Sequence, residues 1–247
     1  MAKFAKWIGG GLAWALTGGS PIGAMIGFAI GSAIDNARVD TNYNSDKQGG
    51  RYQTQAGDFG VSLLILSAAV MKADGKILKS ELSYVKEFFT KQFGVAKTTE
   101  FMKILKGVLE QDINLKEVCG QIKFNMQHPM RLQMLHFLFG IAKSDGNVDE
   151  SEVRVLQQIA AYLGIRESDF ESIKAMFYKS ADSAYKILEI TESDTDYEVK
   201  KAYRKMANKY HPDKVSGAGA EVENAAKEKF QRVQEAYETI KKKRGMN

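Results

Sequence analysis

The sequence contains little cysteine, histidine or proline. Its 247 residues include one cysteine, Cys119, three histidines and three prolines. A single cysteine cannot form an internal disulfide, and no Cys/His group has the spacing of a zinc site, so neither is expected to stabilise the fold. Because prolines are rare and apolar residues recur every three to four positions, the sequence predicts an all-α protein.

The sequence also lacks a strong excess of either charge, with 35 Lys and Arg residues against 30 Asp and Glu residues. The composition, 44% apolar and 26% charged, is typical of folded protein and excludes a disordered chain. The small positive excess indicates an acidic protein partner at least as well as nucleic acid. No nucleic-acid-binding motif occurs, and the basic run 241–244 is interpreted as a solvated tail, so no nucleic-acid partner is predicted.

One long uncharged segment, residues 8–34, lies near the amino terminus. Its 27 residues exceed the roughly 20 that cross a bilayer as a helix, so residues 1–35 are predicted to be a membrane anchor. Small residues recur every fourth position, which is typical of a glycine zipper and predicts a homodimer. The zipper positions are Gly19, Gly23, Gly27 and Gly31. Alternatively, the interruption at 18–21 divides the segment into two short helices that lie in the membrane interface or pack on the protein itself. Residues 36–56 are polar and are predicted to be a flexible linker.

Residues 57–180 are predicted to form a run of amphipathic helices, each 12 to 17 residues long. Within this run, segments 69–81 and 140–152 align without a gap. Each contains an Asp-Gly turn and a glutamate seven positions after the aspartate: Asp74 with Glu81, and Asp145 with Glu152. The repeat predicts two helical hairpins related by an approximate symmetry.

This middle region resembles the TerB-like domain family, and metal binding has been proposed for some of its members. Such a site would use the carboxylates of Asp74, Glu81, Asp145 and Glu152. Turn and helix-capping chemistry, with caps at positions 80 and 151, accounts for the same residues without a ligand, so we predict neither a metal nor a cofactor. His128 and His136 have no ligand partner at suitable spacing and are expected to be structural. No nucleophile or acid-base pair is apparent, and the chain is not predicted to be an enzyme.

Two helical patterns follow Thr191 and flank a short loop. The first has an apolar stripe opposite a cationic strip, and Thr195 and Glu198 have capping-box spacing at its start, with Asp194 as a competing cap. The strip consists of Lys200, Lys201, Arg204, Lys205 and Lys209. The second pattern, residues 226–240, also has one apolar face, and the two helices are expected to pack as an antiparallel hairpin.

The loop reads Tyr210-His211-Pro212-Asp213-Lys214. This sequence and its flanking helices resemble the J-domain family, placing a J domain at 181–247. The resemblance implies that the chain binds a DnaK-type chaperone through His211, Pro212, Asp213, Lys214 and the cationic strip, with Lys200, Lys201, Arg204, Lys205 and Lys209. Proline restricts its own φ and the backbone of the residue before it, so the loop is expected to be stiff.

The order of anchor, TerB-like region and J domain resembles the DjlA-like membrane co-chaperones. That resemblance implies stimulation of a DnaK ATPase at the bacterial inner membrane. A J domain needs a chaperone that uses ATP, so the carboxy-terminal domains are expected in the cytoplasm. The alternative function is a TerB-type scaffold that responds to metal or stress and carries an accessory J domain.

Overall fold

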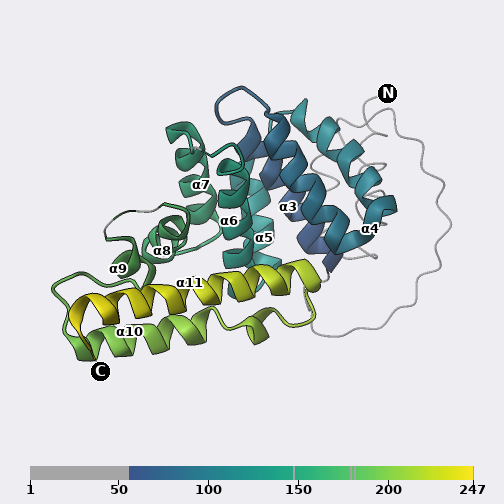
Figure 1. The fold of residues 1–247 in the computed structure, drawn as a ribbon. Coiled ribbons are helices and arrows are strands. Elements are labelled where there is room, and N and C mark those ends of the chain that lie inside the picture. Colours follow the sequence, from purple (N-terminus) through teal and green to yellow (C-terminus); the bar gives the residue numbers. More distant parts are fainter. Residues whose placement is uncertain (1–55, 147, 179, 181, 247) are drawn as a thin grey trace, which may run out of the picture.

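The computed structural model describes residues 56–246 except positions 147, 179 and 181 (Figure 1). The part of the chain that it describes is helical and contains no strand, so the predicted all-α class is confirmed. The predicted anchor at 1–35, its zipper glycines, and all but the last residue of the predicted linker lie outside the described residues.

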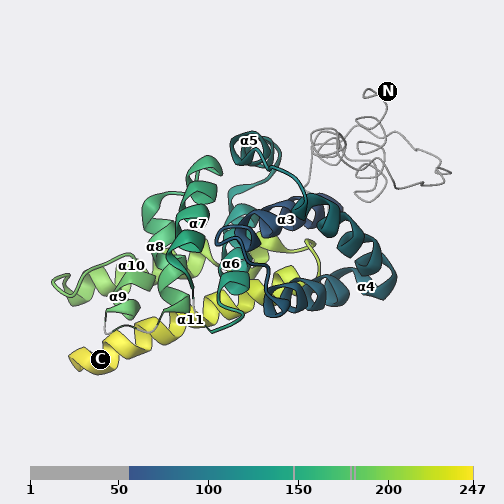
Figure 2. The same cartoon turned by 90° about the horizontal axis from the view of Figure 1, so that it is seen from above.

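A hydrophobic helix forms the centre of the fold. Helix α3, Ala56–Met71, is buried without interruption from Phe59 onward. It packs against α4 (Lys79–Leu109), α5 (Leu115–Asn125), α6 (His128–Ala142) and α7 (Glu150–Tyr162) (Figure 2). A helix that is apolar on every side must be enclosed by its neighbours. This helix therefore differs from the amphipathic pattern expected for the whole region.

The two predicted hairpins are confirmed as α3–α4 and α6–α7, each joined by one of the Asp-Gly turns. Gly75 has φ 79° and Gly146 has φ 98°. Glycine adopts this left-handed region without the Cβ clash that other residues suffer. The same dipeptide therefore produces the same reversal in both halves of the repeat.

Helix lengths differ in part from the expected 12 to 17 residues. Helix α4 has 31 residues, but Gly94 interrupts it with φ 81° and ψ 165°, leaving arms 79–93 and 95–109 within that range. Helices α5 and α8 (Glu167–Phe177) have 11 residues each, fewer than expected. Glycine permits the sharp bend at position 94, which lets one helix wrap two sides of the core.

The carboxy-terminal part contains the short helix α9 (Ser183–Ile187), then α10 (Asp196–Lys209), a 3-10 turn η1 (Pro212–Val215) and the long helix α11 (Ala220–Arg244). Helices α10 and α11 form the predicted antiparallel hairpin, and the rings of Tyr203 and Tyr237 stack between them at 4.3 Å. Helix α11 also packs on α4 and α6, and Figure 1 shows it running beneath the middle bundle. The hairpin is therefore docked on the middle bundle.

The basic end of α11 is bound to the protein. Arg244 donates to the carbonyl oxygens of Glu192 at 2.7 Å and Asp194 at 2.6 Å, and to the hydroxyl of Tyr185 at 3.2 Å. Lys243 pairs with the Glu192 carboxylate at 2.7 Å. The interpretation of 241–244 as a solvated tail is therefore wrong for Arg244, whose side chain is 17% exposed, whereas that of Lys243 is 51% exposed. Their charges tie the end of α11 to the loop before α10.

Candidate partner-binding site

Helix α10 begins where its capping box predicts. The hydroxyl of Thr195 accepts from the backbone N–H of Glu198 at 3.3 Å, and the Glu198 carboxylate accepts from the N–H of Thr195 at 2.7 Å. Asp194 does not compete, because its carboxylate accepts from the N–H of Thr191 at 2.6 Å and closes the preceding turn. The capping box therefore fixes the start of the helix that carries the cationic strip.

The His-Pro-Asp tripeptide follows α10 directly and opens η1. His211 has φ −59° and ψ 132°, the extended conformation that a following proline imposes. Its Nδ1 accepts from the N–H of Asp213 at 3.3 Å, and its ring packs edge-on against Phe230 of α11 at 5.7 Å. The His211 side chain remains 48% exposed and that of Asp213 87% exposed. The turn is therefore restrained by contacts of the His211 ring with the protein, while polar groups of His211 and Asp213 face solvent.

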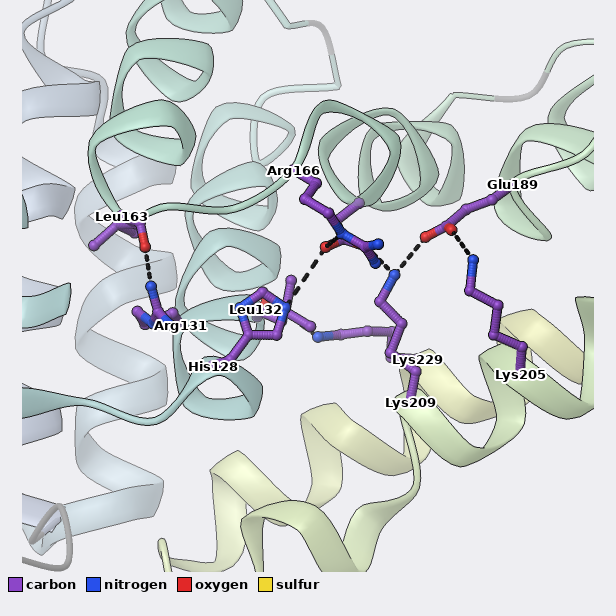
Figure 3. Close-up of polar contacts among 10 residues, drawn as sticks. His128, Arg131, Leu132, Leu163, Arg166, Glu189, Lys205, Lys209 and Lys229 are labelled. Atoms are coloured by element: carbon purple, nitrogen blue, oxygen red, sulfur yellow. Dashed lines mark hydrogen bonds and ion pairs between the residues drawn. The ribbon is translucent and has the colours of Figure 1, made fainter.

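The cationic strip divides into an outer and an inner part. Lys201 and Arg204 of the strip, and Lys214 of the loop, are exposed, and Lys200 is half-buried. By contrast, Lys209 is only 12% exposed, and it pairs with both Asp169 of α8 and Glu189 (Figure 3). Lys205 pairs with Glu189 at 2.8 Å. The structure therefore directs one end of the strip toward the protein itself.

Asp169 is the centre of a polar cluster that the sequence did not indicate. Its side chain is fully buried in α8, where Arg166 at 3.3 Å, Lys209 and the His128 ring at 3.5 Å surround its carboxylate. His128, expected to be structural, is thus a member of this cluster at the start of α6. Arg166 is three positions away at the start of the same helix, but Lys209 and His128 come from α10 and α6, so no local pattern marks the cluster.

Glu189 contributes a second buried carboxylate, with a side chain 5% exposed. Its φ of 59° is the one positive φ among the described non-glycine residues. A left-handed backbone costs such a residue about 1 kcal/mol or more, which the surrounding contacts must offset. The strain places the carboxylate where it receives both Lys205 and Lys209.

Lys229 is a buried amine of α11 that sequence reasoning placed on no functional face. Its Nζ donates to the backbone oxygen of Leu132 in α6 at 3.1 Å (Figure 3) and lies 5.1 Å from the Tyr210 ring centre. Burial lowers the pKa of Lys229 well below its ordinary value, and the nearby charge of Lys209 lowers it further. The neutral amine is therefore favoured at this position.

The glutamates that follow the two Asp-Gly turns cap the next helices, whereas Asp74 accepts from the N–H of Lys76 within its turn at 2.8 Å. Glu81 accepts from the N–H of Leu78, and Glu152 accepts from the N–H of Asp149, each at 2.7 Å. The N-cap residues are Leu78 and Asp149, so the expected caps at positions 80 and 151 are wrong by two residues. Both serines instead lie in the first turn of their helices.

The two turns are near enough to influence one another electrostatically. Burial raises the pKa of Glu152 to about 7, and the charges of Glu81, Asp145 and Asp74 contribute to this rise. Burial likewise raises the pKa of Glu81. Within residues 56–246, omitting the three undescribed positions, no group of three or more His, Cys, Asp or Glu side chains has a metal-binding arrangement. His136 is half-buried, and its ring packs against that of Phe177 at 4.8 Å.

Three family profiles match successive parts of the chain. "Co-chaperone DjlA transmembrane domain" matches residues 1–47, "Tellurite resistance protein TerB" matches 61–175, and "DnaJ domain" matches 183–245. The first match associates the amino-terminal segment with a membrane. In the described part of the chain, no helix combines the length and apolar character required to span a bilayer.

Curated relatives named "Co-chaperone protein DjlA" are similar over most of the chain. The protein of Haemophilus influenzae is 25% identical, covering 99% of each chain, and that of Coxiella burnetii is 26% identical, covering 98% of each. The protein of Vibrio cholerae is 29% identical over 76% of this chain and 79% of the relative. No solved structure matches.

Proposed function

We propose, from the premise that this chain is a DjlA-like co-chaperone with a J domain, that it stimulates ATP hydrolysis by a DnaK-type chaperone at the membrane. In this proposal the chain consists of an anchor at 1–35, a linker at 36–56, a TerB-like domain at 57–180 and a J domain at 181–247. The first residues would hold the protein at the bacterial inner membrane, either across it or on its surface. The later domains would lie in the cytoplasm, where ATP is available.

One observation carries the proposal: the tripeptide is both exposed and stiffened. His211 and Asp213 present hydrogen-bonding groups to solvent from a turn that Pro212 and the Phe230 ring restrain. A group held in its bound conformation loses little entropy when a partner docks. The His-Pro-Asp turn is therefore suited to making directional polar contacts with a protein surface.

The outer cationic strip would bring the partner to this turn. Lys200, Lys201 and Arg204 lie on α10 and Lys214 in η1 after it, and they favour an acidic partner surface. Charges of this kind increase the association rate and orient the encounter, and added salt weakens their effect. Lys205 would contribute in part, and Lys209 would act mainly within the protein, because their ammonium groups already pair with carboxylates.

The test is single-turnover ATP hydrolysis by a bacterial DnaK-type chaperone, titrated with the full chain in detergent micelles. Wild type should accelerate hydrolysis, His211→Gln should not, and raised salt should increase the concentration needed for half-maximal stimulation. Gln157→Ala is the control, because this exposed residue bonds Glu167 within the TerB-like domain. Equal stimulation by wild type and His211→Gln, or none by folded wild type, would refute the proposal.

One further feature of the proposal concerns assembly. Gly19, Gly23, Gly27 and Gly31 would pair two anchors into a homodimer, since small residues at every fourth position allow close helix approach. Cross-linking in lipid vesicles, compared between wild type and Gly23→Leu with Gly27→Leu, tests this pairing. An unchanged dimer fraction in the double variant would exclude the zipper.

A further inference from the structure

The TerB-like domain contacts both ends of the loop that carries the tripeptide. We define this loop as residues 210–219. At its start, Lys209 pairs with the buried Asp169 of α8. At its end, the side-chain amide of Gln92 in α4 donates to the oxygen of Ala218 at 3.0 Å and accepts from the N–H of Glu221 at 2.9 Å. The loop is therefore held at two points by two helices of another domain.

The residues between these two points also face the TerB-like domain. Tyr210 is buried, and the Nζ atoms of Lys209 and Lys229 lie 5.2 Å and 5.1 Å from its ring centre. Lys229 in turn donates to Leu132 in α6, and η1 itself packs on α6. The base of the loop is thus enclosed, and Figure 3 shows Lys229 reaching toward Leu132 and Lys209 toward Glu189.

The Gln92 contact depends on the glycine that ends the loop. Gly219 has φ 109°, a backbone conformation that L side chains rarely adopt. A Cβ at this position would overlap the amide group of Gln92. Gly219 therefore serves both the turn and the close approach of α4 to the loop.

The docked arrangement does not cover the partner-facing groups. His211 and Asp213 remain 48% and 87% exposed, while their neighbours Tyr210 and Val215 are buried. A contact that blocked the partner would bury the tripeptide. This contact instead restrains the ends of the loop and leaves its tip open.

From this geometry we infer that the TerB-like domain positions the His-Pro-Asp loop for the chaperone, with Gln92 and Asp169 as positioning residues. The inference rests on the proposed function. When only a fraction of molecules hold the binding-competent loop, apparent affinity falls by that fraction. We call the contacts of Gln92 and Asp169 with the two ends of the loop the clamp. The clamp raises the fraction of molecules whose loop is competent to bind, so it increases the affinity for the chaperone. It leaves the rate of ATP hydrolysis in the bound complex unchanged.

Gln92→Ala in the full chain is the principal test, with Gln157→Ala as the matched control. In the titration described above, Gln92→Ala should raise the concentration for half-maximal stimulation by roughly threefold to tenfold, because two hydrogen bonds are lost. Maximal stimulation should stay at the wild-type value, and Gln157→Ala should match wild type throughout. An unchanged half-maximal concentration, a lowered one, or a reduced maximum would overturn the inference.

A double-substitution cycle separates the clamp from a general loss of stability. Gly219→Ala displaces the Gln92 amide, so it should weaken the same contact. The effect of Gln92→Ala on the half-maximal concentration should then be smaller in the Gly219→Ala background. If the two substitutions change the half-maximal concentration by factors that simply multiply in the double variant, the two residues act independently, and the inference is overturned. Failure here, with stimulation still lost in His211→Gln, would leave the proposed function intact.

Discussion

Replacing Lys229 with methionine is expected to stabilise the protein, although the change removes a hydrogen bond. The Lys229 side chain is fully buried, and within the described residues it forms no ion pair. Its one polar partner is the oxygen of Leu132, an interior residue of α6 that keeps its helical hydrogen bond without the lysine. Methionine has a similar length and requires no solvation.

The magnitude follows from two opposing effects. Loss of the Lys229 hydrogen bond costs about 1 kcal/mol. Removal of a buried amine without a counter-ion contributes about 2 to 4 kcal/mol in the opposite direction. The free energy of unfolding at pH 7 should therefore increase by roughly 1 to 3 kcal/mol, and Tm should rise by about 2 to 4 °C for each kcal/mol.

The pH dependence provides the sharper test. The folded pKa of Lys229 is depressed, so between that value and the unfolded value near 10.4 the unfolded chain binds one more proton. The stability of wild type should therefore fall as pH decreases through this interval, by up to about 1.4 kcal/mol per pH unit. Lys229→Met has no such slope at this site, and its advantage should shrink as pH approaches 10.

The assay is urea unfolding of the full chain in detergent micelles, followed by helical circular dichroism at pH 7 and pH 9.5. Lys227→Met is the control, because Lys227 is exposed on the same helix. Its unfolding free energy should stay within about 0.5 kcal/mol of wild type. The reasoning fails if Lys229→Met is less stable than wild type at pH 7, or if its advantage is the same at both pH values.

Three further substitutions test the local structure. Because the pKa of Glu152 is raised to about 7, its contribution to stability is present below about pH 4.5 and is lost as pH rises through 7. Glu152→Gln should therefore exceed wild type in unfolding free energy by about 1 kcal/mol at pH 8 and match it at pH 5; an equal difference at both values would contradict the assignment. Thr195→Ala should lower the free energy of unfolding by about 1 kcal/mol in thermal melts, because the α10 cap is lost. Thr195→Ser should retain most of the wild-type stability, because its hydroxyl can still cap the helix. Gly94→Ala should lose about 1 to 2 kcal/mol, because φ 81° is strained for any residue with a Cβ; unchanged stability would mean that the kink relaxes.

The features predicted correctly from sequence are those whose partners lie within a few residues. Thr195 and Glu198 are three positions apart, so their capping box is legible in the sequence. The turns at Gly75 and Gly146 depend on one backbone conformation each. The apolar stripe and cationic strip of α10 follow from the helical period alone.

The wrong predictions from sequence concern features for which the local residues allowed more than one arrangement. Ser151 and Asp149 are both acceptable N-cap residues, and Ser80 is better by type than Leu78. In the structure each helix starts where its glutamate accepts from the backbone N–H, at position 78 or 149. The 31-residue α4 likewise consists of two ordinary helices that Gly94 joins in one element. Arg244 was interpreted as a tail residue because the carbonyl groups that it binds lie about 50 positions away.

The sequence by itself determined the helical class, the repeat, the ends of α10 and the presence of His-Pro-Asp beside a cationic strip. Tertiary structure alone decided that Asp169 meets Lys209 across 40 positions, Leu132 meets Lys229 across 97, and Gln92 meets Ala218 across 126. Capping and helical periodicity act over one or two turns, so they leave a record in residue spacing. Contacts between docked domains depend on how completed helices pack in space, and a single sequence carries no periodic signal for that packing.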